Sequence, residues 1–177
     1  MNIPNLLTIV RILLTPLLVI FLINERFDWA FVVFAAAGIT DGLDGFLARV
    51  MKQKTRVGAI LDPIADKALL ASAYITLAVI GLVPNWLAVT VISRDLIIVF
   101  GVLVLLLFQS GIEIRPTVVS KLTTLFQLFT IFIVLFTTVT HMALDRLLFC
   151  CYIVTAILTI ASGLDYLYKG ILMLGND

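Results

Sequence analysis

Four aspartates with short, regular spacing are the residues of this chain best suited to chemistry. They form two pairs, Asp41 with Asp44 and Asp62 with Asp66, separated by three and by four positions. On a helix, either spacing places both side chains of a pair on one face. Apolar runs flank the stretch on both sides. We therefore expect two helices that meet at a membrane surface, with a cluster of acids between their ends.

Such a cluster requires compensating positive charge. An Asp at the centre of a membrane helix costs about 2.5–3.5 kcal/mol on insertion scales, and crowded like charges repel one another. Two divalent cations would balance four carboxylates, and oxygen ligands without His or Cys favour Mg²⁺, Mn²⁺ or Ca²⁺. Two such ions about 4 Å apart would stabilise the attacking and leaving oxygens of a phosphoryl transfer. The sequence therefore predicts a metal-dependent site on these four aspartates.

Small and basic residues accompany the acids. Gly45, Ala48 and Gly58 each lie four positions from an aspartate, so the acid-bearing faces carry little side-chain bulk. The same small residues would also suit close packing of membrane helices. Arg49 follows at the end of the first acidic segment, and its planar guanidinium suits a diphosphate. The basic loop beyond it could bind phosphate or simply anchor the chain at the membrane.

The composition indicates an integral membrane protein. The chain has 177 residues, of which 62% are hydrophobic and 13% charged, whereas soluble domains average about 25% charged residues. We therefore expect one membrane domain over residues 1–177. A formal net charge of +1 does not suggest nucleic acid as a partner.

Six apolar segments approach the length of about 20 residues that a transmembrane helix requires. The predicted fold is an all-α integral membrane protein with six transmembrane helices and a short N-terminal surface segment. The predicted spans are residues 6–23, 29–47, 59–83, 86–108, 122–140 and 144–168. Most Lys and Arg residues fall on the side of the two termini and the 49–57 and 109–121 loops. The positive-inside rule then places both termini and the acidic site at the cytoplasmic face.

The N-terminal segment has two interpretations. Thr8 and Arg11 are one helical turn apart on one face, just after Pro4 and Asn5. The segment could be a helix start with an arginine that extends to the membrane surface. It could equally be a short surface helix that contributes polar groups to a headgroup site.

The acidic stretch resembles the signature of the CDP-alcohol phosphotransferase family. The pattern is Asp-x-x-Asp-Gly-x-x-Ala-Arg, then eight residues, then Gly-x-x-x-Asp-x-x-x-Asp. The chain matches every fixed position: Asp41, Asp44, Gly45, Ala48, Arg49, Gly58, Asp62 and Asp66. Members of this family are typically six-helix membrane enzymes of similar size, usually homodimeric. The resemblance extends over the whole chain.

The resemblance implies a role for each matching residue. The four aspartates would hold two divalent cations, Mg²⁺ or Mn²⁺, and Asp66 would also be the general base. The reaction would be attack by an alcohol on CDP-diacylglycerol with release of CMP, at a bacterial inner membrane. The N-terminal segment would close over the nucleotide. The residues implied for CDP-lipid binding are Pro4, Asn5, Thr8, Asp41, Gly45, Ala48, Arg49, Thr55 and Gly58.

The second half of the chain guides the choice of acceptor. Phosphatidylglycerophosphate synthases, which use the dianion glycerol 3-phosphate, usually show additional cations in the fourth span and before the fifth. This chain instead has Ser93-Arg94-Asp95, followed by an apolar run, and Ser120-Lys121-Leu122-Thr123-Thr124. The pattern is closer to cardiolipin synthases, whose acceptor is phosphatidylglycerol, and glycerol 3-phosphate is the alternative.

Arg94, Arg115 and Lys121 would contact the acceptor phosphate in either case. Arg94 could instead form an intramembrane ion pair with Asp95, and the other two could simply be inside-positive charges. A different class, a divalent-cation transporter, would also place acidic residues in membrane helices.

Overall fold

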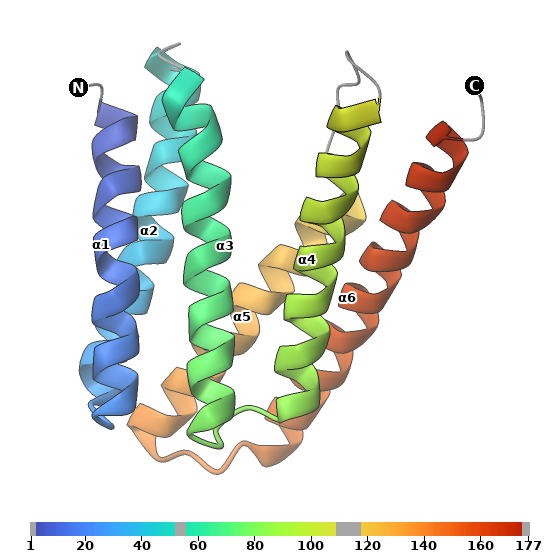
Figure 1. Ribbon diagram of the computed structural model, residues 1–177. Coiled ribbons are helices and arrows are strands. Elements are labelled where there is room, and N and C mark those ends of the chain that lie inside the picture. Colours follow the sequence, from blue (N-terminus) through green and yellow to red (C-terminus); the bar gives the residue numbers. More distant parts are fainter. Residues whose placement is uncertain (1–2, 52–55, 109–117, 175–177) are drawn as a thin grey trace. The chain divides into compact units, whose positions relative to one another are not determined.

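The computed structural model describes residues 3–51, 56–108 and 118–174, and side chains over 8–41, 63–101 and 118–169. Over this part the chain is all helical, without strands, as expected (Figure 1). The helices are α1 (Ile3–Ile23), α2 (Phe27–Met51), α3 (Arg56–Val79), α4 (Asn85–Phe108), α5 (Val118–Thr140) and α6 (Asp145–Leu174).

The six helices coincide with the six predicted apolar segments to within a few residues at most ends. One expectation is wrong: residues 3–23 form one continuous helix, so the N-terminal surface segment is not a separate element. Of the described residues, α5 and Asp145–Lys169 of α6 are long and apolar enough to cross a membrane. Six crossings therefore stay a prediction.

The chain divides into two compact units, each described here by itself. The first unit comprises Met1–Val83 with Ile131–Ala143. In it α1 packs against both α2 and α3; α1 and α3 run in the same direction and α2 runs in the opposite one (Figure 1). Its interior includes fully buried Leu18, Tyr74 and Leu77. This packing brings one face of α1 against both helices that carry the acidic signature.

Two helices of the first unit end in the same hydrogen-bonded turn. At the end of α1, the N–H of Arg26 donates to the carbonyl of Phe21 at 2.9 Å, and Glu25 has φ 55°. At the end of α3, the N–H of Leu82 donates to the carbonyl of Leu77 at 2.9 Å, and Gly81 has φ 80°. A left-handed residue after the last turn is the usual way to satisfy terminal carbonyls.

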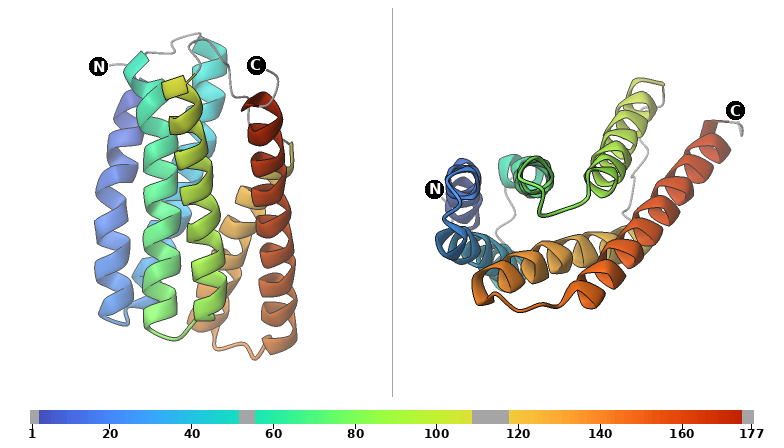
Figure 2. Two further views of the ribbon diagram at one scale, coloured as in Figure 1. Left: turned by 45° about the vertical axis from the view of Figure 1, so that its right-hand side comes forward. Right: turned by 90° about the horizontal axis from the view of Figure 1, so that it is seen from below.

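The second unit comprises Pro84–Thr130 with Leu144–Asp177. In it α4 packs along α6, and the two helices run in the same direction (Figure 2). Its polarity is inverted relative to a soluble protein. Gln127 and Thr159 are fully buried, whereas Phe100, Ile157 and Leu164 are exposed. Apolar side chains outside and hydrogen-bonded polar side chains inside are typical of helices surrounded by lipid.

Candidate functional site

Three helices of the first unit meet at a buried arginine. Arg11 of α1 lies between Asp41 of α2 and Asp66 of α3. Its Nη2 is 3.1 Å from Oδ1 of Asp41, and its Nη1 is 2.5 Å from Oδ1 of Asp66. The Arg11 side chain is 1% exposed, whereas those of Asp41 and Asp66 are 48% and 39% exposed. The guanidinium is therefore enclosed by protein, and the two carboxylates reach the surface.

Arg11 is buried, and its charge is paired with carboxylates from two neighbouring helices. A planar guanidinium can donate to two acceptors at once, which a lysine cannot do with the same geometry. Thr8, one turn earlier, is also fully buried. The face of α1 that carries Thr8 and Arg11 is therefore buried in the first unit.

The donor set fits a hard divalent cation as far as it is described. Two predicted ligand carboxylates approach a single cationic group from different helices, and carboxylate oxygens are the ligands that Mg²⁺ and Mn²⁺ prefer. Asp44 and Asp62 lie on α2 and α3, but their side chains are outside the described residues. Among described side chains, no group of three or more potential ligands gathers. Metal binding stays a prediction.

The other predicted CDP-lipid residues can be placed only along the backbone. Apart from Thr8 and Asp41, their side chains are outside the described part of the chain. Pro4 and Asn5 lie on α1, Gly45, Ala48 and Arg49 on α2, and Gly58 on α3. Thr55 and the predicted acceptor residue Arg115 fall outside the described backbone. Lys121 is exposed near the start of α5.

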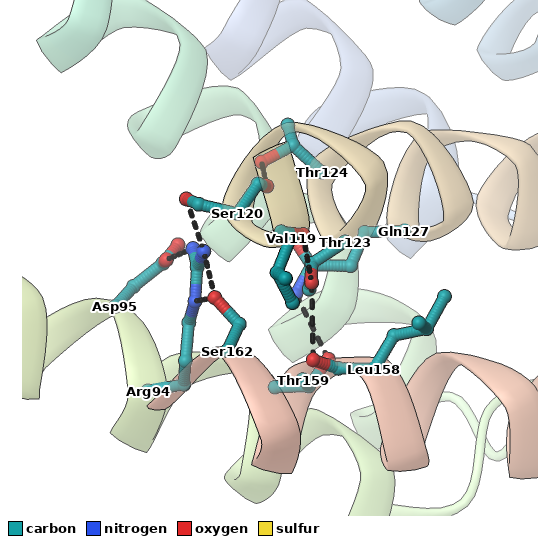
Figure 3. A network of polar contacts seen from close by, with 10 residues as sticks. All are labelled: Arg94, Asp95, Val119, Ser120, Thr123, Thr124, Gln127, Leu158, Thr159 and Ser162. Carbon is teal, nitrogen blue, oxygen red and sulfur yellow. Dashed lines mark hydrogen bonds and ion pairs between the residues drawn. The ribbon is translucent and has the colours of Figure 1, made fainter. Parts of the chain in front are cut away.

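A second buried arginine organises the second unit (Figure 3). Arg94 of α4 is 5% exposed, and its Nη1 donates to Oδ1 of Asp95 at 2.6 Å. Its Nη2 donates to Ser120 of α5 at 2.6 Å and to Ser162 of α6 at 2.8 Å. Its Nε also faces Ser162, at 3.3 Å. Gly163 lies beside the side chain, and a Cβ there would be 3.6 Å from Cγ of Arg94.

Arg94 thus donates hydrogen bonds to residues on all three helices of its unit. A guanidinium has five N–H donors, and all three nitrogens of Arg94 donate here, to one carboxylate and two hydroxyls. The ion pair with Asp95, expected as one alternative, is present. An incoming phosphate at Arg94 would therefore share or exchange these partners.

A ladder of polar side chains joins α5 to α6 in the same unit (Figure 3). The hydroxyl of Thr123 donates to the carbonyl of Leu158 at 3.0 Å, and Nε2 of Gln127 donates to the hydroxyl of Thr159 at 3.2 Å. One turn further, the hydroxyls of residues 130 and 155 are 2.7 Å apart. Interhelical hydrogen bonds of this kind hold membrane helices together.

Sequence reasoning missed this ladder and Ser162, although a signal was present. The fully buried polar positions that face this contact are 123, 127 and 130 on α5, and 155, 159 and 162 on α6. Both sets follow the i, i+4, i+7 spacing that marks one helix face. Two apolar segments that each carry one polar stripe are expected to place the stripes against each other. Asp165, which had no assigned role, pairs with Lys169 at 2.9 Å on the same helix.

Together, the apolar helices and the two signature aspartates that contact Arg11 indicate a helical membrane protein with an acidic site. The family model described as CDP-alcohol phosphatidyltransferase matches residues 1–165. The chain belongs to this family, which confirms the resemblance inferred from the signature.

Relatives in this family carry two different names. The chain is similar to the rat cardiolipin synthase (CMP-forming), with 36% identity over 188 residues, covering 96% of this chain and 61% of the rat protein. The human protein of the same name is 34% identical, with 62% of its length covered. A CDP-diacylglycerol–glycerol-3-phosphate 3-phosphatidyltransferase of Aquifex aeolicus is 33% identical over the full length of both chains. The chain thus spans about three-fifths of the two mammalian relatives, and overall identity does not separate the two names.

Proposed function

We propose that this protein transfers a phosphatidyl group from CDP-diacylglycerol to the hydroxyl of a glycerol-type acceptor and releases CMP. The carrying observation is that Asp41 and Asp66, on different helices of the family signature, converge at Arg11 with their carboxylates exposed. Family membership supports the reaction class. The names of the relatives support CDP-diacylglycerol and a glycerol-type acceptor as the two substrates.

The proposed step is one displacement at phosphorus. The acceptor oxygen forms a bond to the phosphorus that bears diacylglycerol, and the bond from that phosphorus to the bridging oxygen of the diphosphate breaks. The electron pair of the broken bond leaves with CMP, and Asp66 takes the proton of the acceptor hydroxyl as general base. With 39% of its side chain exposed, Asp66 is open to an approaching hydroxyl.

The signature residues have complementary proposed roles in this step. Two Mg²⁺ or Mn²⁺ ions held by the four signature aspartates would stabilise charge on the diphosphate. Arg49 would bind the diphosphate with its planar fork, and Gly45, Ala48 and Gly58 would leave room for the nucleotide. Pro4, Asn5, Thr8 and Thr55 complete the proposed CDP-lipid site.

For the acceptor, we favour phosphatidylglycerol over glycerol 3-phosphate. Glycerol 3-phosphate is a dianion at neutral pH and requires several uncompensated cations, whereas a phosphodiester carries one negative charge. Arg94 is already paired with Asp95 at 2.6 Å, and its other partners among the described residues are neutral hydroxyls. Such a site suits the less charged acceptor. Arg115 and Lys121 are the further proposed acceptor contacts.

The proposed setting is a homodimer with six membrane crossings per chain, termini and site at the cytoplasmic face of a bacterial inner membrane. Support comes from six long apolar helices, two of which meet the requirements of a span over the described residues. The large apolar side chains exposed on the described faces also favour a lipid environment.

Product analysis tests the function directly. Purified protein with CDP-diacylglycerol and Mg²⁺ receives phosphatidylglycerol in one reaction and glycerol 3-phosphate in another. We expect CMP and cardiolipin from the first only. Phosphatidylglycerophosphate from the second would keep the reaction class and overturn the acceptor. Absence of CMP in both, with divalent-cation uptake into protein-containing vesicles that lack CDP-lipid, would favour a transporter.

A further inference from the structure

Arg11 has a place in the acidic site that the proposed reaction does not explain. It is the largest fully buried side chain among those described, and it carries a permanent positive charge. It pairs with two signature aspartates, one on each neighbouring helix. Burying an arginine is costly unless the charge is paired. The pairing therefore ties the fold of the first unit to the geometry of the site.

We propose that Arg11 is the resident counter-ion of the acidic cluster, a positioning residue that holds Asp41 and Asp66 in place before any divalent cation binds. Without metal, the four signature aspartates have a formal charge of −4, and Arg11 reduces the sum to −3. Like charges at such spacing repel one another. A buried guanidinium that contacts one carboxylate on α2 and one on α3 opposes their separation.

The exposure of the three side chains indicates that Arg11 stays in place when ions or substrate arrive. Arg11 is 1% exposed, and the carboxylates are 48% and 39% exposed. The arginine thus contacts the acids from the protein side, and another cation can approach them from the open side. Arg11 then acts through Asp41 and Asp66 and needs no contact with the reacting atoms.

This role makes the importance of Arg11 depend on metal. Once divalent cations neutralise the acids, less repulsion remains for Arg11 to offset. A neutral substitution should therefore destabilise the metal-free protein more than the metal-bound protein, and by linkage the variant should gain more stability from metal. A purely structural arginine would cost the same in both states. The metal comparison rests on the proposed metal site, and the charge comparison below does not.

The first experiment compares Arg11→Gln with wild type by thermal unfolding of the full chain in detergent, in EDTA and in Mn²⁺. In EDTA we expect the variant's Tm to fall by about 10 °C. We expect the Tm rise caused by Mn²⁺ to be at least about twofold larger in the variant than in wild type. Arg26→Gln is the matched control, because Arg26 is an exposed arginine of the same unit, and it should leave both Tm values unchanged. The proposal would be overturned if Mn²⁺ raises the Tm of the wild type and raises the Tm of Arg11→Gln by the same amount.

A second experiment in EDTA remains decisive even if metal has no effect. Arg11→Gln is made in the wild type and in an Asp41→Asn background. In the double variant the formal sum of the cluster is again −3, as in the wild type. We expect the Tm loss caused by Arg11→Gln to be at most about half as large in that background. The same loss in both backgrounds would show that Arg11 does not act as counter-ion to Asp41 and would overturn the proposal. A wild type insensitive to Mn²⁺ would instead contradict the metal part of the proposed function. If Arg11→Gln does not fold, Arg11→Met, which is also uncharged, replaces it in the same cycle.

Discussion

Each of the two units is held together around one buried arginine, and the two arginines have different partners. Arg11 contacts two carboxylates from two other helices. Arg94 contacts one carboxylate from the adjacent residue and two hydroxyls from two other helices. Both side chains connect three helices of their own unit, so the structural task is the same. The described partners differ in charge, because two carboxylates face the guanidinium of Arg11 and one carboxylate faces that of Arg94.

This charge difference favours different ligands at the two arginines. On the proposed function, divalent cations at the acidic cluster would offset its negative charge and stabilise charge on the phosphate groups. An arginine paired with one carboxylate and bonded to hydroxyls has a defined orientation. On the same proposal, it would suit an acceptor with one negative charge better than a dianion.

The largest expected effect is on catalysis at the acidic site. Asp66→Asn keeps the size of the side chain but removes the base, so we expect CMP release to fall by about 10²–10⁴-fold. The measurement is the rate of CMP release with CDP-diacylglycerol and phosphatidylglycerol. Asp165→Asn is the control, because Asp165 pairs with Lys169 along the surface of α6 and should leave the rate unchanged.

Binding has to be measured beside the rate. Binding of CDP to the Asp66→Asn protein, followed by the rise in Tm, shows that the loss is chemical and not a failure to fold. Undiminished turnover in Asp66→Asn would contradict the assignment of the base.

Arg94 should give the next largest effect, and it should appear in stability. Arg94→Met removes the guanidinium that pairs with Asp95 in a mostly buried position, and breaking such a pair costs about 3–5 kcal/mol. We expect an apparent Tm lower by about 10 °C, and Asp95→Asn in the same chain should restore part of it by removing the carboxylate charge that Arg94 offset. If the double variant is no more stable than Arg94→Met, the hydroxyl contacts contribute more than the ion pair.

The sequence predicted the helices well and made the family signature recognisable, because both depend on local patterns. Long apolar runs define helix positions, and two pairs of aspartates at helical spacing define a common face. The partners of Arg11 are 30 and 55 positions away along the chain. No local periodicity shows which of several acids a buried arginine will contact, so this pairing required the packing of α1 on α2 and α3.

The partners of Arg94 were predictable only in part. Asp95 is adjacent in sequence and was recognised as a possible partner, whereas Ser162 lies 68 positions away. Serine and threonine in a membrane helix can bond to the carbonyl of their own preceding turn, as Thr124 does with Ser120 at 3.1 Å. A single serine or threonine in an apolar run therefore does not identify an interhelical contact, and only a stripe at i, i+4, i+7 spacing indicates one.

Ser162→Ala should have the smallest effect of the series and is the most specific test of the Arg94 site. It removes the acceptor of two Arg94 hydrogen bonds, at 2.8 and 3.3 Å, but keeps the arginine and its ion pair. A hydrogen bond to a charged group contributes about 1.5–3 kcal/mol, so we expect a Tm lower by about 5 °C. Because the guanidinium is then less fixed, KM for phosphatidylglycerol should rise several-fold with little change in kcat.

The control for this variant is Ser93→Ala, an exposed serine on the same helix as Arg94, which should change neither quantity. A lower Tm with unchanged KM would show that Ser162 only stabilises the packing of α4 on α6. A higher KM in Ser162→Ala would instead connect the orientation of Arg94 with acceptor binding. In that case the two arginines differ in function as well as in the charge of their partners. Arg11 arranges the acids that act on the phosphate, and Arg94 orients the alcohol that attacks it.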